Sequence, residues 1–138
     1  MIRVVLDTSV VVSAVISPDG PNAGIFDLIV SGEVRTYLTE AVLAEYSRVF
    51  DYERLKHLDR RRIARLLRML ESTSVMVKPR GRLKISGHEE DNRIYECAVA
   101  AKAKYIVTEN ARHFKEAYKM TKIVTARQLL RLLKDELE

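Results

Sequence analysis

The chain has 138 residues, of which 47% are hydrophobic and 31% are charged, and its formal net charge is +5. This length accommodates one domain and excludes a second core of useful size, while the apolar share excludes a disordered chain. No apolar run reaches the roughly 18 residues of a membrane span, and the single Cys97 excludes an internal disulfide, so we expect a cytoplasmic protein without membrane partners.

The first quarter of the chain predicts two strands separated by helices. Residues 2–6 form a short apolar run that is typical of a buried strand, and a helix is expected over 10–15. A second helix over 25–30 is expected to end at Gly32, because glycine suits the left-handed conformation of a helix C-terminus. Residues 34–38 then predict the second strand.

The middle of the chain predicts two amphipathic helices. Thr39 is expected to cap a helix over 40–50, whose apolar side chains fall on one stripe. A second, basic helix is expected over 59–71. This helix carries five arginines, which are Arg60, Arg61, Arg62, Arg65 and Arg68. They form either a solvated face or a binding surface, and such a surface would suit RNA phosphates or an acidic partner segment.

The rest of the chain continues the alternation of strands and helices. Strands are expected at 75–77, 105–108 and 123–124, and helices at 91–103 and from Thr125 to about Leu137. Short buried strands that alternate with helices predict a parallel sheet of about five strands covered on both faces. The predicted fold is therefore one three-layer α/β/α domain, with ligands at the carboxyl ends of the strands.

Three acidic residues stand where such a fold places its ligands. Asp7 follows the first strand, so its carboxylate either caps the next helix or faces a cleft. Glu45 falls just beside the buried stripe of its helix, which fits a solvated side chain or a cleft residue. Asp91 shares one helix face with Ile94, whereas Glu96 points to the opposite side, and Asp91 is either an N-cap or part of a site.

Five segments in chain order carry a family resemblance: VLDTSVVVSA (5–14), SPDGP (17–21), LAEY (43–46), EDNRIYECA (90–98) and AKYIVT (103–108). In this order and spacing they resemble PIN-domain proteins, in particular the toxin components of prokaryotic toxin–antitoxin pairs. The resemblance covers nearly the full chain. It implies a Rossmann-like parallel sheet in which acids from a strand end and two helices meet at one cleft.

The resemblance also implies the site residues and the cofactor. Asp7, Glu45 and Asp91 match the family's catalytic and metal-binding acids, and carboxylates brought together favour a hard cation such as Mg²⁺ or Mn²⁺. Asn110 matches the fourth position, where many relatives have Asp or Asn. His113 stands where others have Asp, so the pattern leaves open one metal ion or two. Thr8 and Ser9 are expected to orient a carboxylate or a substrate phosphate.

The function that the resemblance implies is metal-dependent hydrolysis of RNA phosphodiester bonds. The expected substrate is single-stranded or structured RNA, and the expected partners are a neutralising antitoxin protein and, as in small relatives, a second copy of the chain. Two alternatives stay open. One is a degenerate PIN domain that binds RNA or a partner protein without cleavage, and the other is a processing or flap nuclease with the same acids.

Overall fold

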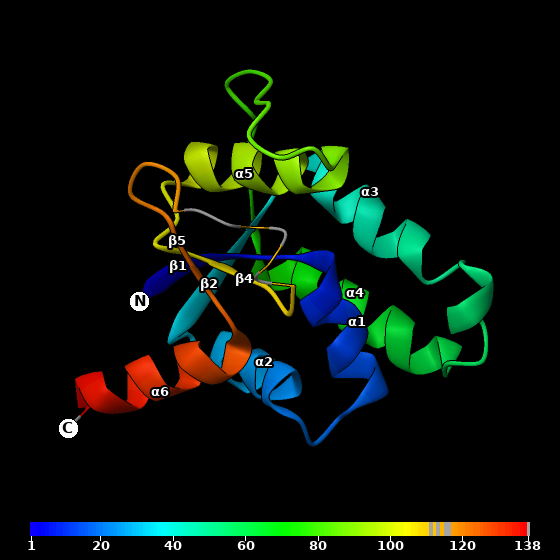
Figure 1. Ribbon diagram of the computed structural model, residues 1–138. Coiled ribbons are helices and arrows are strands. Elements are labelled where there is room, and N and C mark those ends of the chain that lie inside the picture. Colours follow the sequence, from blue (N-terminus) through cyan, green and yellow to red (C-terminus); the bar gives the residue numbers. More distant parts are fainter. Residues whose placement is uncertain (111, 113, 115–116, 138) are drawn as a thin grey trace.

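A computed structural model describes residues 1–110, 112, 114 and 117–137 (Figure 1). Its centre is a five-stranded sheet in the order β3-β2-β1-β4-β5, and every pair of neighbouring strands is parallel. The strands are β1 (Ile2–Leu6), β2 (Val34–Leu38), β3 (Val75–Met76), β4 (Tyr105–Val107) and β5 (Lys122–Val124). The predicted parallel sheet of about five strands is confirmed.

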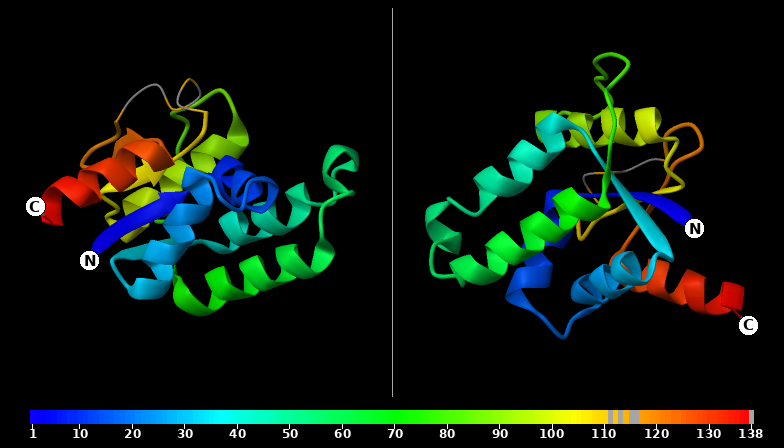
Figure 2. Two further views of the ribbon diagram at one scale, coloured as in Figure 1. Left: turned by 90° about the horizontal axis from the view of Figure 1, so that it is seen from below. Right: turned by 180° about the vertical axis from the view of Figure 1, so that it is seen from behind.

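Helices cover both faces of this sheet. They are α1 (Thr8–Ile16), α2 (Pro21–Ser31), α3 (Glu40–Val49), α4 (Arg60–Thr73), α5 (Glu89–Ala101) and α6 (Ala126–Leu137), with a 3-10 turn η1 (Glu53–Leu55) between α3 and α4. Figure 1 shows α5 across one face and α2, with α6 beside it, across the other. In Figure 2, α3 and α4 form an antiparallel pair that extends from the sheet. The predicted three-layer α/β/α architecture is confirmed.

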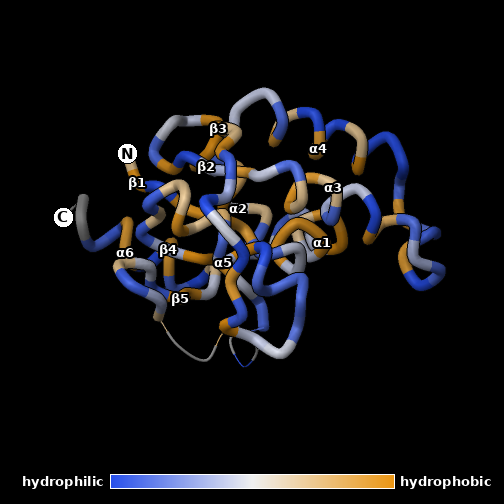
Figure 3. The backbone as a smooth tube through the Cα atoms, turned by 90° about the horizontal axis from the view of Figure 1, so that it is seen from above, coloured by the Kyte–Doolittle hydropathy of each residue, from blue (hydrophilic) through white to orange (hydrophobic). Residues whose placement is uncertain are grey.

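The core lies between the sheet and these helices. Figure 3 shows hydrophobic residues concentrated in the strands and the centre of the molecule, while the connection between α3 and α4 is mostly hydrophilic. Val4, Val5 and Ile106 are fully buried in the two central strands, as expected for a sheet covered on both faces. Among the residues that the structure describes, no helix combines the length and the apolar character needed to cross a bilayer.

Local capping explains where several helices begin and end. Thr39 Oγ1 accepts a hydrogen bond from the Val42 amide at 3.2 Å, and Gly32 ends α2 with φ of 85°, both as the sequence predicted. Helix α5 begins at Glu89, two residues before the expected start, because three acids in its first turn suit the positive end of the helix dipole. Asp91 is therefore inside the helix, and its interpretation as an N-cap is wrong.

The strand order places a ligand crevice between two central strands. Strand β1 pairs with β2 on one side and with β4 on the other, so the connections on the two sides of β1 lead away from it in opposite directions. Ligands of such sheets bind where these connections separate, at the carboxyl ends of the strands. Leu6 and Val107 are register partners there, so the next residues, Asp7 and Thr108, are neighbours.

Candidate active site

Asp7 is held by two hydroxyl groups from opposite sides of the crevice. Its Oδ2 accepts hydrogen bonds from Ser9 Oγ at 2.6 Å and from Thr108 Oγ1 at 2.8 Å. The residue occupies the N-cap position of α1, but its side chain makes no capping hydrogen bond. The carboxylate, 8% exposed, is therefore oriented by the crevice rather than used to close the helix.

Each of these hydroxyls is itself held by a backbone amide. The Glu109 N–H donates to Ser9 Oγ at 3.0 Å, and the Asn110 N–H donates to Thr108 Oγ1 at 3.0 Å. Because a carboxylate oxygen only accepts, each hydroxyl uses its own hydrogen to donate to Asp7 and a lone pair to accept from the amide. Both bonds reach Oδ2, and within the described part of the chain Oδ1 accepts none, so Oδ1 retains its lone pairs for a ligand.

Tyr46 fixes α3 against the end of β1. Its phenol is fully buried and donates a hydrogen bond to the Leu6 carbonyl oxygen, directly before Asp7. Burial raises the pKa of Tyr46 well above its usual value, and the nearby Cys97 and Asp7 raise it further, so the phenol stays protonated. This contact brings the preceding residue, Glu45, to the same crevice.

A cleft of about 490 Å³ opens at this point. Its lining includes five acidic side chains and one basic side chain: Asp7, Glu45, Glu90, Asp91, Glu109 and Arg54. The chain as a whole carries a charge of +5, so acidic groups are concentrated in the cleft against the overall balance. A cleft with this excess of negative charge repels phosphate and attracts cations when no cation is bound.

Glu45 is paired with a neighbouring arginine. Arg48 Nη2 contacts Glu45 Oε2 one helical turn away, and the Glu45 carboxylate raises the pKa of the Arg48 guanidinium. Glu45 is 15% exposed and Arg48 is 60% exposed. Glu45 lines both the cleft and a second hollow of about 280 Å³ that also contains Arg48 and Arg93. Arg48 therefore competes with a cation for this carboxylate.

The first turn of α5 carries Asp91 into the cleft and ties down the loop before it. Asn92 is fully buried, and its Oδ1 accepts hydrogen bonds from the amides of Ile85 at 3.0 Å and Ser86 at 2.7 Å. The Ser86 hydroxyl donates to Asp91 Oδ2 at 3.4 Å. Glu96 does not line the cleft, and it accepts a hydrogen bond from the Leu83 amide at 2.9 Å.

All six site residues named from the sequence line this cleft: Asp7, Thr8, Ser9, Glu45, Asp91 and Asn110. Asn110 is exposed at its rim, and His113 lies outside the described residues. Over the described ranges, no three acid, histidine or cysteine side chains converge as a ready metal cluster. Cys97 is no nucleophile, because burial raises the pKa of its thiol to about 12.

Several residues of the cleft were not predicted from the sequence. Thr108 holds Asp7, while Glu109, Glu90 and Arg54 line the walls. Thr108 follows β4 as Asp7 follows β1, so a polar residue directly after a buried strand was an available signal. Arg54 lies in the turn between two helices and offered no comparable signal.

Comparisons with known proteins agree with this fold. The sequence profile of the family described as PIN domain matches residues 3–112. The chain is 32% identical over 104 residues to the uncharacterized protein MJ1680 of Methanocaldococcus jannaschii, an alignment that covers 74% of this chain and 67% of that protein. It is also similar in structure to a chain in the crystal structure of VapBC2 from Rickettsia felis bound to a DNA fragment from their promoter. The TM-score is 0.59 at 16% identity, with 88% of this chain and 98% of that chain covered.

Proposed function

Because this chain belongs to the PIN domain family, we propose that it is a divalent-metal-dependent endoribonuclease that hydrolyses RNA phosphodiester bonds. The observation that carries the proposal is the acidic cleft at the carboxyl ends of β1 and β4, in which two hydroxyls hold the Asp7 carboxylate with Oδ1 left open. A carboxylate oriented in this way is typical of a metal ligand supported by neighbouring hydrogen bonds.

The chemistry of the donor set fits Mg²⁺ or Mn²⁺. Asp7, Glu45 and Asp91 offer carboxylate oxygens, Asn110 offers a neutral carbonyl oxygen, and hard divalent cations prefer oxygen ligands of this kind. When bound, the cation supplies a water of lowered pKa and positive charge beside the phosphate. Arg48 pairs with Glu45 Oε2 and so competes with the cation for this carboxylate.

The protein's own residues have distinct tasks in this mechanism. Ser9 and Thr108 prevent the Asp7 carboxylate from rotating, so that Oδ1 keeps one direction during the reaction. Ser86 restrains Asp91 on the opposite wall of the cleft. Thr8 lines the cleft beside Asp7 and is assigned to a substrate phosphate oxygen. The acidic lining repels RNA until its charge is compensated, which makes activity depend on the cation.

We assign the protein to the toxin type of the family, with an antitoxin protein as its partner. The likeness to a chain of the Rickettsia felis VapBC2 structure supports this assignment at the level of fold. A segment that covers the cleft would silence the activity without a change in the fold. The non-cleaving alternative is supported by one observation, the pairing of Glu45 with Arg48, which compensates the charge of one acid of the cleft.

Addition and removal of metal test the proposed function. Purified protein is expected to cleave single-stranded RNA with Mg²⁺ or Mn²⁺, to stop in excess EDTA, and to recover when Mn²⁺ is added back, because the cleft acids repel phosphate without a cation. Gel analysis of an end-labelled RNA follows each step. Equal cleavage in excess EDTA would exclude the metal mechanism, and no cleavage with any divalent metal would favour the non-cleaving alternative.

Arg48→Gln tests whether the arginine restrains Glu45. The variant is expected to lower the Mn²⁺ concentration for half-maximal activity by roughly two- to fivefold, the range for one exposed charge. The physical reason is that Glu45 loses its competing partner. Arg35→Gln on β2 removes an equal exposed charge outside the cleft and serves as the control. An unchanged titration for Arg48→Gln would mean that Glu45 lies outside the metal shell.

A further inference from the structure

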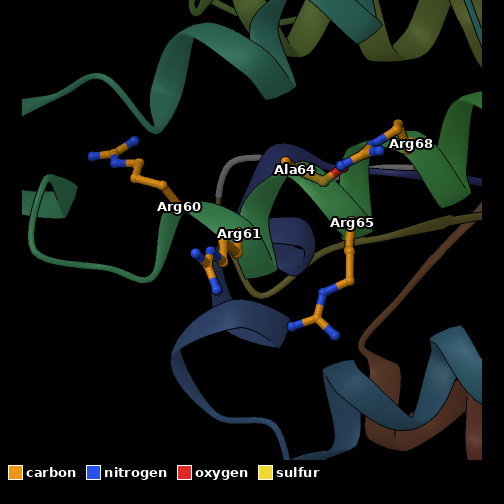
Figure 4. Close-up of a pocket in the computed structure, with 5 residues that line it drawn as sticks. All are labelled: Arg60, Arg61, Ala64, Arg65 and Arg68. Carbon is orange, nitrogen blue, oxygen red and sulfur yellow. The ribbon is translucent and has the colours of Figure 1, made fainter.

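Helix α4 carries a hollow lined almost entirely by arginine. Its volume is about 630 Å³, and its lining residues are Arg60, Arg61, Ala64, Arg65 and Arg68. All of these arginines are exposed. Figure 4 shows Arg61 and Arg65 pointing to one side of α4 and Arg68 lying back along the helix over Ala64, while Arg60 extends away from the other three. We call Arg61, Arg65 and Arg68 the arginine face.

The arginine face has no acidic partner within the described part of the chain. None of its three guanidinium groups forms an ion pair there, and Arg68 donates from Nε to the Ala64 carbonyl oxygen at 3.4 Å. An acid one turn away would stabilise each arginine and compensate its charge. The charge of this face is therefore available to an external anion.

The placement of these charges is unfavourable for the helix itself. Arg60, Arg61 and Arg62 fill the first turn of α4, where the positive end of the helix dipole disfavours cations. Asp59 supplies the cap that this end requires, through its Oδ1 and the Arg61 amide at 2.9 Å. The helix dipole therefore gives no reason for arginines in this first turn, whereas an anion bound at this end benefits from both the dipole and the guanidinium groups.

The arginine face is regularly spaced. Residues 61, 65 and 68 lie three or four positions apart, so their side chains start from one side of α4 over an axial length of about 10 Å at 1.5 Å per residue. A row of guanidinium groups suits a chain of repeated anions better than a single ion. Guanidinium also binds phosphate oxygens in a bidentate manner, which lysine does not do.

Arg60 connects this face to the acidic cleft. Its guanidinium donates to the Phe50 carbonyl oxygen at 2.8 Å and to the Leu55 carbonyl oxygen at 3.4 Å. These bonds hold the turn that carries Tyr52 and Arg54, both of which line the cleft. Tyr52 is 42% exposed, and the Arg54 guanidinium carbon lies 5.9 Å from its ring centroid.

We propose that the arginine face binds consecutive backbone phosphates of single-stranded RNA and leads the strand past Tyr52 into the cleft. This inference rests on the proposed function, because it names how that substrate is held. An exposed aromatic ring combined with a row of cations is used for single strands, since bases stack on the ring while phosphates contact the cations. An acidic protein segment would use the same cations, whereas stacking on an exposed ring together with contacts to a row of cations is typical of single strands.

The test measures binding without cleavage. Wild type and the triple variant Arg61→Gln/Arg65→Gln/Arg68→Gln are titrated in EDTA with a fluorescein-labelled, unstructured 12-nucleotide RNA at several salt concentrations. The affinity falls as salt rises, by about 0.7 in log affinity per log salt for each single-strand phosphate contact. The loss of three contacts is therefore expected to make this slope less steep by about 2. Arg60 is retained, so the turn before α4 keeps its anchor.

A matched control exists on α6. Arg127, Arg131 and Lys134 are exposed at the same spacing, so Arg127→Gln/Arg131→Gln/Lys134→Gln removes equal charge from another helix. The proposal requires this variant to keep the wild-type slope. If the salt dependence of RNA affinity became weaker by the same amount in both triple variants, net charge alone would explain the effect, and the proposal would be overturned. So would an α4 variant that keeps RNA affinity and loses only binding to a poly-glutamate peptide.

The binding test can fail or succeed independently of the proposed function. Binding in EDTA does not require catalysis, so a lower slope for the α4 variant supports the arginine face even if the wild type fails to cleave RNA. If the triple variant is unstable, Arg61→Gln and Arg65→Gln are tested singly, and each is expected to lower the slope by about 0.7. An unchanged slope in both would overturn the proposal.

Discussion

Asp7→Asn is expected to lower kcat/KM for single-stranded RNA by on the order of 10³-fold, because a metal ligand supplies several kcal/mol of transition-state stabilisation. The two hydroxyls that donate to Oδ2 would hold the amide oxygen of the variant in that place. Its NH₂ group then points where Oδ1 stood, and an N–H donor cannot bind a cation. The melting temperature is expected to stay close to that of the wild type, since both hydroxyl bonds persist.

Controls separate this effect from a general loss of acid. Asp27→Asn changes an exposed carboxylate of α2 outside the cleft and is expected to leave activity unchanged. Ser9→Ala and Thr108→Val each remove one bond to Asp7 and are expected to lower kcat/KM by about 10- to 100-fold. A fully active Asp7→Asn enzyme, measured with the same end-labelled RNA, would remove Asp7 from the mechanism.

Glu96→Ala and Asp91→Asn are expected to give opposite results, although these acids lie in one helix. Glu96 is 5% exposed and accepts hydrogen bonds from the Leu83 amide and from Arg93 Nη2 at 2.8 Å. Removal of Glu96 leaves Arg93, 20% exposed, with the exposed Glu89 as its one remaining ion-pair partner among the described residues. We expect a loss of about 3 kcal/mol in the free energy of unfolding and about 10 °C in Tm.

Asp91→Asn is expected to retain Tm within a few degrees and to lose most of its activity, because Asp91 lines the cleft and the substitution keeps its size. Thermal unfolding by circular dichroism and RNA cleavage at 25 °C measure both variants. Activity per folded molecule should survive in Glu96→Ala, since that side chain holds the loop at Leu83 and not the cleft. An unchanged Tm for Glu96→Ala would mean that this buried ion pair does not stabilise the fold.

Much of the fold follows from local sequence. The apolar runs of β1 and β2 predicted both strands, and Thr39 and Gly32 marked helix ends, because capping and hydrophobic spacing act over a few residues. The helical phase of α5 also separated Asp91 from Glu96 correctly. The family resemblance then identified six of the residues that line the cleft.

Only the tertiary structure decided how the cleft residues are paired. Ser9 and Thr108 are 99 residues apart, and they meet at one Asp7 oxygen because β1 and β4 are adjacent in the strand order. The pairing of Glu45 with Arg48 is different, because it joins residues three positions apart in one helix and is therefore local to the sequence. Sequence patterns fix which face of an element a side chain occupies. The choice of hydrogen-bond partner depends on groups that folding brings together from distant parts of the chain.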